Sequence, residues 1–322
     1  MNEGFRIKTR FRIAFIGAGF MAREHIRAFS DIEDVEISGI FSRTNKKAHD
    51  LCSEMGLDCP VYNSTADLYA GTEAHLVVIA VPELAGRAVC FEAFQFPWVC
   101  LIEKPAGYTV ADAEIIFAES LRLDRRAFVA LNRRYYSSTA SVLKDLAAHE
   151  GQRLVHVYDQ ENPGVALSSG QPEEVVNNWM YANSIHLVDY FTLFCRGKLL
   201  SVDVLSPWQM NTACFVLAQL TYESGDIGLY EAIWEGPGPW AVTVTSKFRR
   251  WEMKPLEQAG FQNYQSRQLE LMPVDQWDID FKPGLRRQAG EAIKALRGES
   301  HELADLETGL RTMLITERIY EQ

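Results

Sequence analysis

A glycine-containing motif near the N-terminus has the residue types and spacing needed to hold phosphate groups. Residues 17–22 read Gly-Ala-Gly-Phe-Met-Ala, which fits G-x-G-x-x-G/A between a strand-like run and a helix-like segment. Such glycines permit a tight turn and let the backbone approach a pyrophosphate, and the free N–H groups of the next helix favour its negative charge. The motif therefore predicts a dinucleotide-binding site, formed by Gly17, Ala18, Gly19, Phe20 and Met21.

The choice between NAD and NADP depends on the residues after the second predicted strand. A carboxylate there would hold the ribose 2′-hydroxyl and repel a 2′-phosphate. Residues 41–48 contain no Asp or Glu and include Ser42 and Arg43 instead. The planar guanidinium of Arg43 suits a phosphate, although it could equally stack on the adenine and leave the ribose to Ser42 alone. Ser42 and Arg43 are therefore predicted cofactor ligands, and NADP is favoured over NAD.

A second motif, Glu103-Lys104-Pro105, follows the apolar run 98–102, at the edge of the predicted parallel sheet where ligands bind. By itself this tripeptide is most often a surface turn. Together with the glycine motif, Ala80-Val81-Pro82 and Asn132-Arg133-Arg134, it resembles the glucose-fructose oxidoreductase / inositol dehydrogenase (Gfo/Idh/MocA) family. The resemblance extends over nearly the whole chain, to a closing helix-like segment at 303–320.

The resemblance implies a two-domain NAD(P)-dependent dehydrogenase that acts on sugars, cyclitols or related small molecules. It makes Lys104 the catalytic lysine and adds cofactor-binding residues, namely Ala80, Val81, Pro82, Glu103 and Lys104. A partly buried lysine has a lowered pKa and can donate or accept a proton. Its charge would also stabilise an alkoxide that develops as hydride leaves. The peptide bond before Pro105 is a candidate for the cis form.

The second-domain motif of the family, D-x-x-x-H-x-x-D, is incomplete in this chain. His186 and Asp189 match, but Ala182 replaces the first carboxylate. The resemblance assigns His186, with Lys104, to the proton chemistry, although a histidine in so apolar a helix is more often structural. Ala182 and His186 would share one helical face. Asp189 either orients His186 or serves the packing between the domains.

Polar and aromatic residues near these motifs are candidates for contact with the substrate. The predicted substrate-binding residues are Lys104, Arg134, Tyr181, Asn183 and His186, and Trp179 is plausible on the same terms. Arginine and tyrosine side chains can hydrogen-bond to a sugar and stack on it. A role for Arg134 in the hinge between the domains is equally open.

Three functions are consistent with these residues. The leading one is reversible hydride transfer between NAD(P) and a hydroxyl or ketone of a sugar-like or cyclitol substrate. The loss of a carboxylate at Ala182 leaves open a non-catalytic dinucleotide-binding sensor of the same fold. Reduction of a non-sugar carbonyl or an imine is a third possibility.

The elements that must position these residues fall into two parts. Residues 11–105 alternate short apolar runs with helix-period segments, as in a parallel sheet with crossover helices. After residue 127, strand-like segments joined by turns predominate, and the Gly-Pro-Gly-Pro turn at 236–239 predicts a hairpin. We therefore predict an α/β chain with an N-terminal Rossmann domain, residues 1–125. A C-terminal α+β domain with a large, mainly antiparallel open sheet, residues 126–322, would bind substrate and mediate oligomerisation.

The composition restricts the classes of molecule that we expect the protein to bind. The chain has 322 residues, 47% of them hydrophobic, and a net charge of −11. This acidity argues against a nucleic-acid partner, and no apolar run reaches the ~18 residues that cross a bilayer. The six cysteines have no metal-like spacing, and residues 1–10 lack the apolar core of a secretion signal. We expect a cytoplasmic homo-oligomer, a dimer or tetramer, with a small-molecule substrate and no metal.

Overall fold

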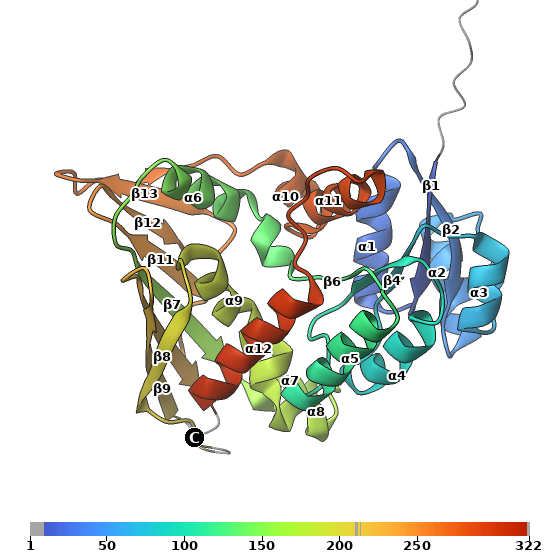
Figure 1. Cartoon of the computed structure of the whole chain (residues 1–322), viewed down its shortest axis with the longest axis horizontal. Coiled ribbons are helices and arrows are strands. Elements are labelled where there is room, and N and C mark those ends of the chain that lie inside the picture. The colour runs from blue at the N-terminus through green and yellow to red at the C-terminus, as the bar shows by residue number, and fades with distance from the viewer. Residues whose placement is uncertain (1–9, 210–211, 213, 321–322) are drawn as a thin grey trace, which may run out of the picture.

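The computed structural model describes residues 10–209, 212 and 214–320. Residues 1–9, most of the polar N-terminal segment considered above, lie outside the described residues. Two sheets stand side by side, each covered by helices (Figure 1). None of the described helices is both long and apolar enough to cross a membrane.

The first sheet is wholly parallel, with strand order β3-β2-β1-β4-β5-β6. Its strands are β1 (Phe11–Ile16), β2 (Val35–Phe41), β3 (Val61–Tyr62), β4 (Leu76–Ile79), β5 (Val99–Ile102) and β6 (Ala127–Val129). The central strands β4 and β5 are apolar at every position and fully buried, because helices cover both faces. This is the predicted Rossmann sheet.

Helices from two distant parts of the chain cover this sheet. One face packs against α1 (Phe20–Ser30), α2 (Asn45–Met55) and α11 (Leu285–Arg297), and the other against α3 (Thr65–Thr72), α4 (Glu83–Ala93) and α5 (Val110–Arg122). Strand β6, which pairs with β5, lies beyond residue 125. A division at that residue would remove β6 and α11 from the layers in which they pack.

The second sheet has eight strands in the order β14-β13-β12-β11-β7-β10-β9-β8. They are β7 (Leu154–Glu161), β8 (Leu199–Ser206), β9 (Cys214–Tyr222), β10 (Ile227–Trp234), β11 (Ala241–Thr245), β12 (Arg249–Met253), β13 (Ala259–Asn263) and β14 (Glu270–Leu271). All neighbours are antiparallel except β7 and β10. The predicted mainly antiparallel sheet is therefore confirmed.

The hairpin predicted at residues 236–239 is wrong. Strands β10 and β11, which this turn connects, do not pair, because β7 lies between them and bonds to both. A turn pattern reports only that the chain reverses locally. The pairing is decided by which strands bury their apolar side chains together, and Val155 and Val157 of β7 are fully buried in the centre of the sheet.

The remaining helices pack on the second sheet or between it and the first domain (Figure 1). They are η1 (Asn132–Tyr135), α6 (Ser137–Ala147), α7 (Pro163–Ser168), α8 (Glu173–Asn177), η2 (Met180–Ser184), α9 (Ile185–Phe194), α10 (Gln276–Asp280) and α12 (Leu306–Tyr320). Helix α12 contacts both α5 and α9 and so bridges the domains (Figure 1). The strands β8 and β9 also expose large apolar side chains, including Leu200, Leu205 and Phe215. The homo-oligomer stays a prediction.

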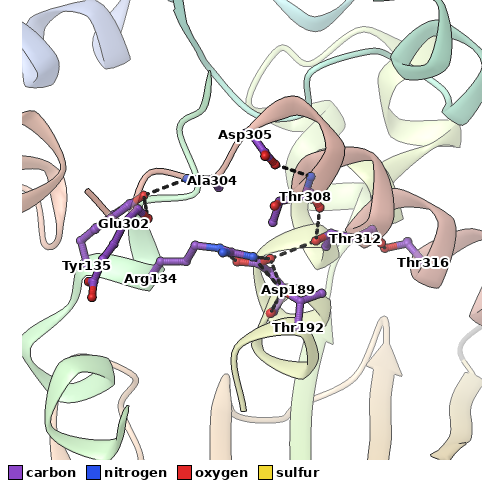
Figure 2. A network of polar contacts seen from close by, with 10 residues as sticks. All are labelled: Arg134, Tyr135, Asp189, Thr192, Glu302, Ala304, Asp305, Thr308, Thr312 and Thr316. Atoms are coloured by element: carbon purple, nitrogen blue, oxygen red, sulfur yellow. Dashed lines mark hydrogen bonds and ion pairs between the residues drawn. The ribbon is translucent and has the colours of Figure 1, made fainter. Parts of the chain in front are cut away.

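A buried ion pair ties the end of the first domain to the helices of the second (Figure 2). Arg134 of η1 donates from Nε to Asp189 Oδ2 at 2.6 Å and from Nη2 to Oδ1 at 2.5 Å. The hydroxyls of Thr192 in α9 and Thr312 in α12 donate to the same carboxylate. Of the two roles predicted for Asp189, this geometry favours packing between the domains.

Replacing Asp189 by Asn should destabilise the fold. The amide removes a charge and leaves the buried Arg134 without a counter-ion, which should lower the free energy of unfolding by about 3 kcal/mol in urea titrations. The matched control is Asp50→Asn, which removes the partner of Lys46 on the surface and should change stability by less than about 1 kcal/mol. Equal losses in the two variants would contradict this account of the network.

Candidate active site

The glycine turn fits the phosphates of a dinucleotide. Gly17 has φ +112°, and a Cβ there would lie 2.0 Å from the carbonyl oxygen of Ala80 after β4. Gly19 faces open space, with no atom within 4 Å of an added Cβ. No acidic residue occupies the first turn of α1 and no side chain caps it, so its N–H groups are available to an anion. Phe20 beside them is exposed.

Ser42 and Arg43 lie next to this turn, because Gly17 N donates to the carbonyl of Phe41 at the end of β2 over 2.8 Å. Arg43 is exposed, and among the described residues its guanidinium has no ion pair. Lys46, one turn further along, is paired with Asp50. Among the described residues, Arg43 and Lys47 are thus exposed cations without an ion pair at this edge of the sheet, and Arg43 is the nearer of the two to the glycine turn in sequence.

Glu103 fastens the end of β5 to α1. Its side chain is buried, and Oε1 accepts a hydrogen bond from Nε2 of the fully buried His25 at 2.6 Å. Its other oxygen accepts from the backbone N–H of Lys104. His25 was missed by the sequence reasoning, since one polar residue among several in α1 gives no sign of a partner 78 positions away. The pair fixes the segment that carries Lys104.

Lys104 points across to the second domain. Its Nζ donates to the backbone carbonyl of Ala182 at 2.7 Å, and the Lys104–Pro105 bond is cis. Burial lowers the pKa of Lys104; the charge of Glu103 opposes this shift and that of Arg133 adds to it. The residue that lacks the family carboxylate thus still supplies a hydrogen-bond acceptor, from its main chain.

The segment around Ala182 differs from the regular helix expected there. Residues 180–184 form the π-helical turn η2, and the α-helix starts only at Ile185. Ala182 therefore lies in the π-turn and His186 in the first turn of the α-helix, so the two residues do not belong to one regular α-helix. A π-turn is rare and is often found at functional sites.

Glu161 holds this π-turn in place through hydrogen bonds to its side chains. It ends β7, is buried, and accepts bonds from Asn183 Nδ2 to both carboxylate oxygens, at 3.0 and 2.9 Å, and from the Ser184 hydroxyl at 3.2 Å. Burial, and next the charge of Asp159, hold the pKa of Glu161 well above its usual range. Sequence reasoning missed both carboxyls, although they continue the inward alternation of β7 after Val157.

His186 is a buried imidazole. It is 8% exposed, and among the described residues nothing bonds to its Nδ1. Burial, followed by the charges of Arg133, Lys104 and Lys282, holds the pKa of His186 well below its usual value. Asp189 is committed to Arg134, so it does not serve as a carboxylate partner of His186.

Arg133 and Lys282, which the sequence reasoning did not select, also lie near Lys104 and His186. Arg133 stacks over Trp240, 4.7 Å from the ring centroid, and Lys282 lies 5.7 Å from the ring of Phe20. Successive residues of a 3₁₀ turn point about 120° apart, so of Arg133 and Arg134 only the tertiary structure decides which approaches His186. No local pattern marks Lys282.

Tyr181 and Trp179 differ in burial and in the contacts of their side chains. Tyr181 lies in the hydrophobic core of the second domain, 2% exposed, so its contact with substrate stays a prediction. Trp179 is half-buried and hydrogen-bonds Glu161. The predicted residues that the structure brings together are therefore Lys104 and His186, with Asn183 one residue beyond Ala182.

A phosphate-binding glycine turn, a lysine at the carboxyl edge of a parallel sheet and a second sheet across the interface define a two-domain dinucleotide-dependent oxidoreductase. Residues 11–131 match the model of an oxidoreductase family with an NAD-binding Rossmann fold. This domain is therefore similar to the NAD-binding domain of the Gfo/Idh/MocA oxidoreductases, in agreement with the resemblance seen in the sequence.

Known relatives are similar over a large part of the chain. A 4-carboxy-2-hydroxymuconate-6-semialdehyde dehydrogenase from Sphingobium sp. is 22% identical over 71% of this chain and 73% of that protein. A glucose-6-phosphate 3-dehydrogenase from Bacillus subtilis is 27% identical over 62% of this chain and 58% of its own length. The solved UDP-N-acetylglucosamine 3-dehydrogenase from Acidithiobacillus ferrooxidans shares the fold, with TM-score 0.78 and 17% identity over 96% of each chain.

Glu161→Gln should make stability less dependent on pH. Because the pKa of Glu161 is raised in the folded state, the folded protein keeps a proton that the unfolded chain releases. Stability is therefore lost as pH rises from the unfolded toward the folded pKa, by up to about 1.4 kcal/mol per pH unit. Urea unfolding between about pH 5 and 8 should show a shallower decline in the variant. The exposed Glu307→Gln serves as control, and parallel declines in both variants would refute the assignment.

Proposed function

We propose that the protein catalyses reversible hydride transfer between NAD(P) and a hydroxyl or ketone of a sugar-like or cyclitol substrate. The observation that carries this proposal is the position of Lys104, which follows a strand of the parallel sheet and bonds to Ala182 of the second domain. The printed names of the relatives include dehydrogenases of glucose 6-phosphate and UDP-N-acetylglucosamine. They support a substrate of this class.

The nicotinamide, when bound, would accept or supply the hydride. Lys104 would exchange the hydroxyl proton through Nζ, since its lowered pKa increases the share of free amine at neutral pH. In its charged form the same group would stabilise the alkoxide. His186, held neutral, offers one N–H donor and one acceptor with which to orient the hydroxyl.

The absence of a side-chain carboxylate at Ala182 has a defined consequence. A backbone carbonyl accepts a hydrogen bond from Lys104 but cannot take its proton, so Lys104 and His186 carry the proton chemistry. The alternative, a non-catalytic dinucleotide-binding sensor, depends on that missing carboxylate. The hydrogen bond from Lys104 to Ala182 weakens this alternative, because it holds the lysine in place without an acidic side chain.

Lys104→Met should abolish the proton transfer and leave cofactor binding intact. We expect kcat to fall by at least about 100-fold in a screen of sugars, nucleotide sugars and inositols followed by reduced-nicotinamide absorbance. Oxidation by the unaltered protein should speed up with rising pH through a pKa below the usual 10.5 of lysine, and the variant should lack this rise. Lys144→Met, at an exposed lysine of α6, is the control. Full activity of the Lys104 variant would overturn the assignment.

We also propose that NADP is preferred through Arg43, which is exposed and has no ion pair among the described residues. Arg43→Gln should weaken NADP binding by about tenfold and leave NAD within about twofold, because only NADP presents the 2′-phosphate. Equilibrium binding of both cofactors measures the ratio. Arg122→Gln, on the outer side of α5, is the matched control. An unchanged ratio in the Arg43 variant would show that this arginine does not select the cofactor.

A further inference from the structure

Positive charge gathers around His186 although the chain as a whole is acidic. Lys104, Arg133 and Lys282 all act on His186, and among the described residues none of the three forms an ion pair. Of the nearby carboxyls, Glu103 bonds to His25 and Asp189 to Arg134, while the charge of Glu83 in α4 acts on Lys104. Arg133 and Lys282 have no ion pair among the described residues, and unpaired cations held close together are costly, so this part of the cleft favours a negative ligand.

Arg133 has the most specific geometry of the three. It is only 9% exposed, yet its Nη1 is buried and has no hydrogen-bond partner. Its guanidinium lies over Trp240, whose Nε1 donates to the carbonyl of Gln160 and so fixes the ring. A buried, oriented guanidinium presents a fork that matches a carboxylate or a phosphate. His186 Nδ1 is also buried and unpartnered.

The position of Arg133 indicates that it would contact the substrate rather than the cofactor. Arg133 lies in η1, after the last strand of the parallel sheet, and it contacts Trp240 between β10 and β11 of the second domain. The phosphates of the cofactor are matched by the glycine turn at Gly17 and Gly19, at the start of α1. Lys282, over Phe20, lies between the two regions.

We propose that the substrate carries an anionic group, a carboxylate or a phosphate, that Arg133 binds while Lys104 and His186 face the reacting carbon. This inference rests on the proposed function and makes it more specific. Lys282 adds positive charge to the same cleft. A hydroxyl of a neutral polyol could accept a hydrogen bond from Arg133 but would leave its charge unpaired, whereas an acid of the same carbon skeleton would pair that charge.

The test is calorimetric binding to the full chain saturated with NADP, so that the probes do not compete for the cofactor phosphate site. The probes form two matched series, namely glycerol, D-glycerate and glycerol 3-phosphate, and D-glucose, D-glucuronate and glucose 6-phosphate. We expect an acidic member to bind at least about tenfold more tightly than its neutral parent. The tighter of the carboxylate and phosphate members identifies the group.

Variants show whether Arg133 is responsible. Arg133→Gln should remove the preference for acidic over neutral probes. Arg133→Lys should keep part of this preference, because the charge remains without the planar guanidinium. Arg311→Gln, on the surface of α12, should keep all of it. Thermal unfolding of each variant verifies the fold. If Arg133→Gln does not fold, the reduced preference of Arg133→Lys decides the matter.

The result that would overturn the inference is equal or absent binding of acidic and neutral members, or a preference that survives in the folded Arg133 variants. Turnover of the same probes, measured in parallel, tests the proposed function separately. Preferential binding of acids without any turnover would contradict the dehydrogenase and leave the anion site standing. Turnover of neutral polyols, combined with equal affinity for these polyols and their acids, would support the dehydrogenase and contradict the anion site.

Discussion

The hydrogen bond between Lys104 Nζ and the carbonyl of Ala182 is the constraint on which the site depends. It joins the edge of the parallel sheet to the π-turn of the second domain. Burying an ammonium group requires a good acceptor, and a main-chain oxygen provides one without adding negative charge. The hydrogen bond holds the lysine in place, and burial lowers its pKa, two properties that favour proton transfer.

The supporting carboxyls hold the two sides of this bond in place through hydrogen bonds to other residues. Glu103 bonds to His25 beneath the Lys104 segment, and Glu161 bonds to Asn183 beneath the π-turn. Asp189 is neutralised by Arg134. Because each carboxyl has a structural partner, the charge that remains around His186 is positive. The missing family carboxylate at Ala182 increases this imbalance, which is why it bears on the substrate as well as on the proton chemistry.

Much of the first domain could be predicted from the sequence because its signals are local. The glycine turn needs residues without side chains at Gly17 and Gly19, and buried parallel strands such as β4 and β5 must be apolar throughout. The position of Lys104 follows from the strand that precedes it. The second sheet was also visible through the alternation of its strands, but their order was not, as the false hairpin at 236–239 shows.

By itself the sequence determined the fold class, the dinucleotide turn and the candidate pair of Lys104 and His186, since each depends on residue type and spacing within one segment. Only the tertiary structure decided that Arg133 approaches His186 while Arg134 binds Asp189. It also decided that the backbone carbonyl of Ala182 accepts the hydrogen bond from Lys104. The physical reason is the same in each case. Desolvation and charge pairing depend on groups that are distant in sequence, and these meet only when both domains are packed together.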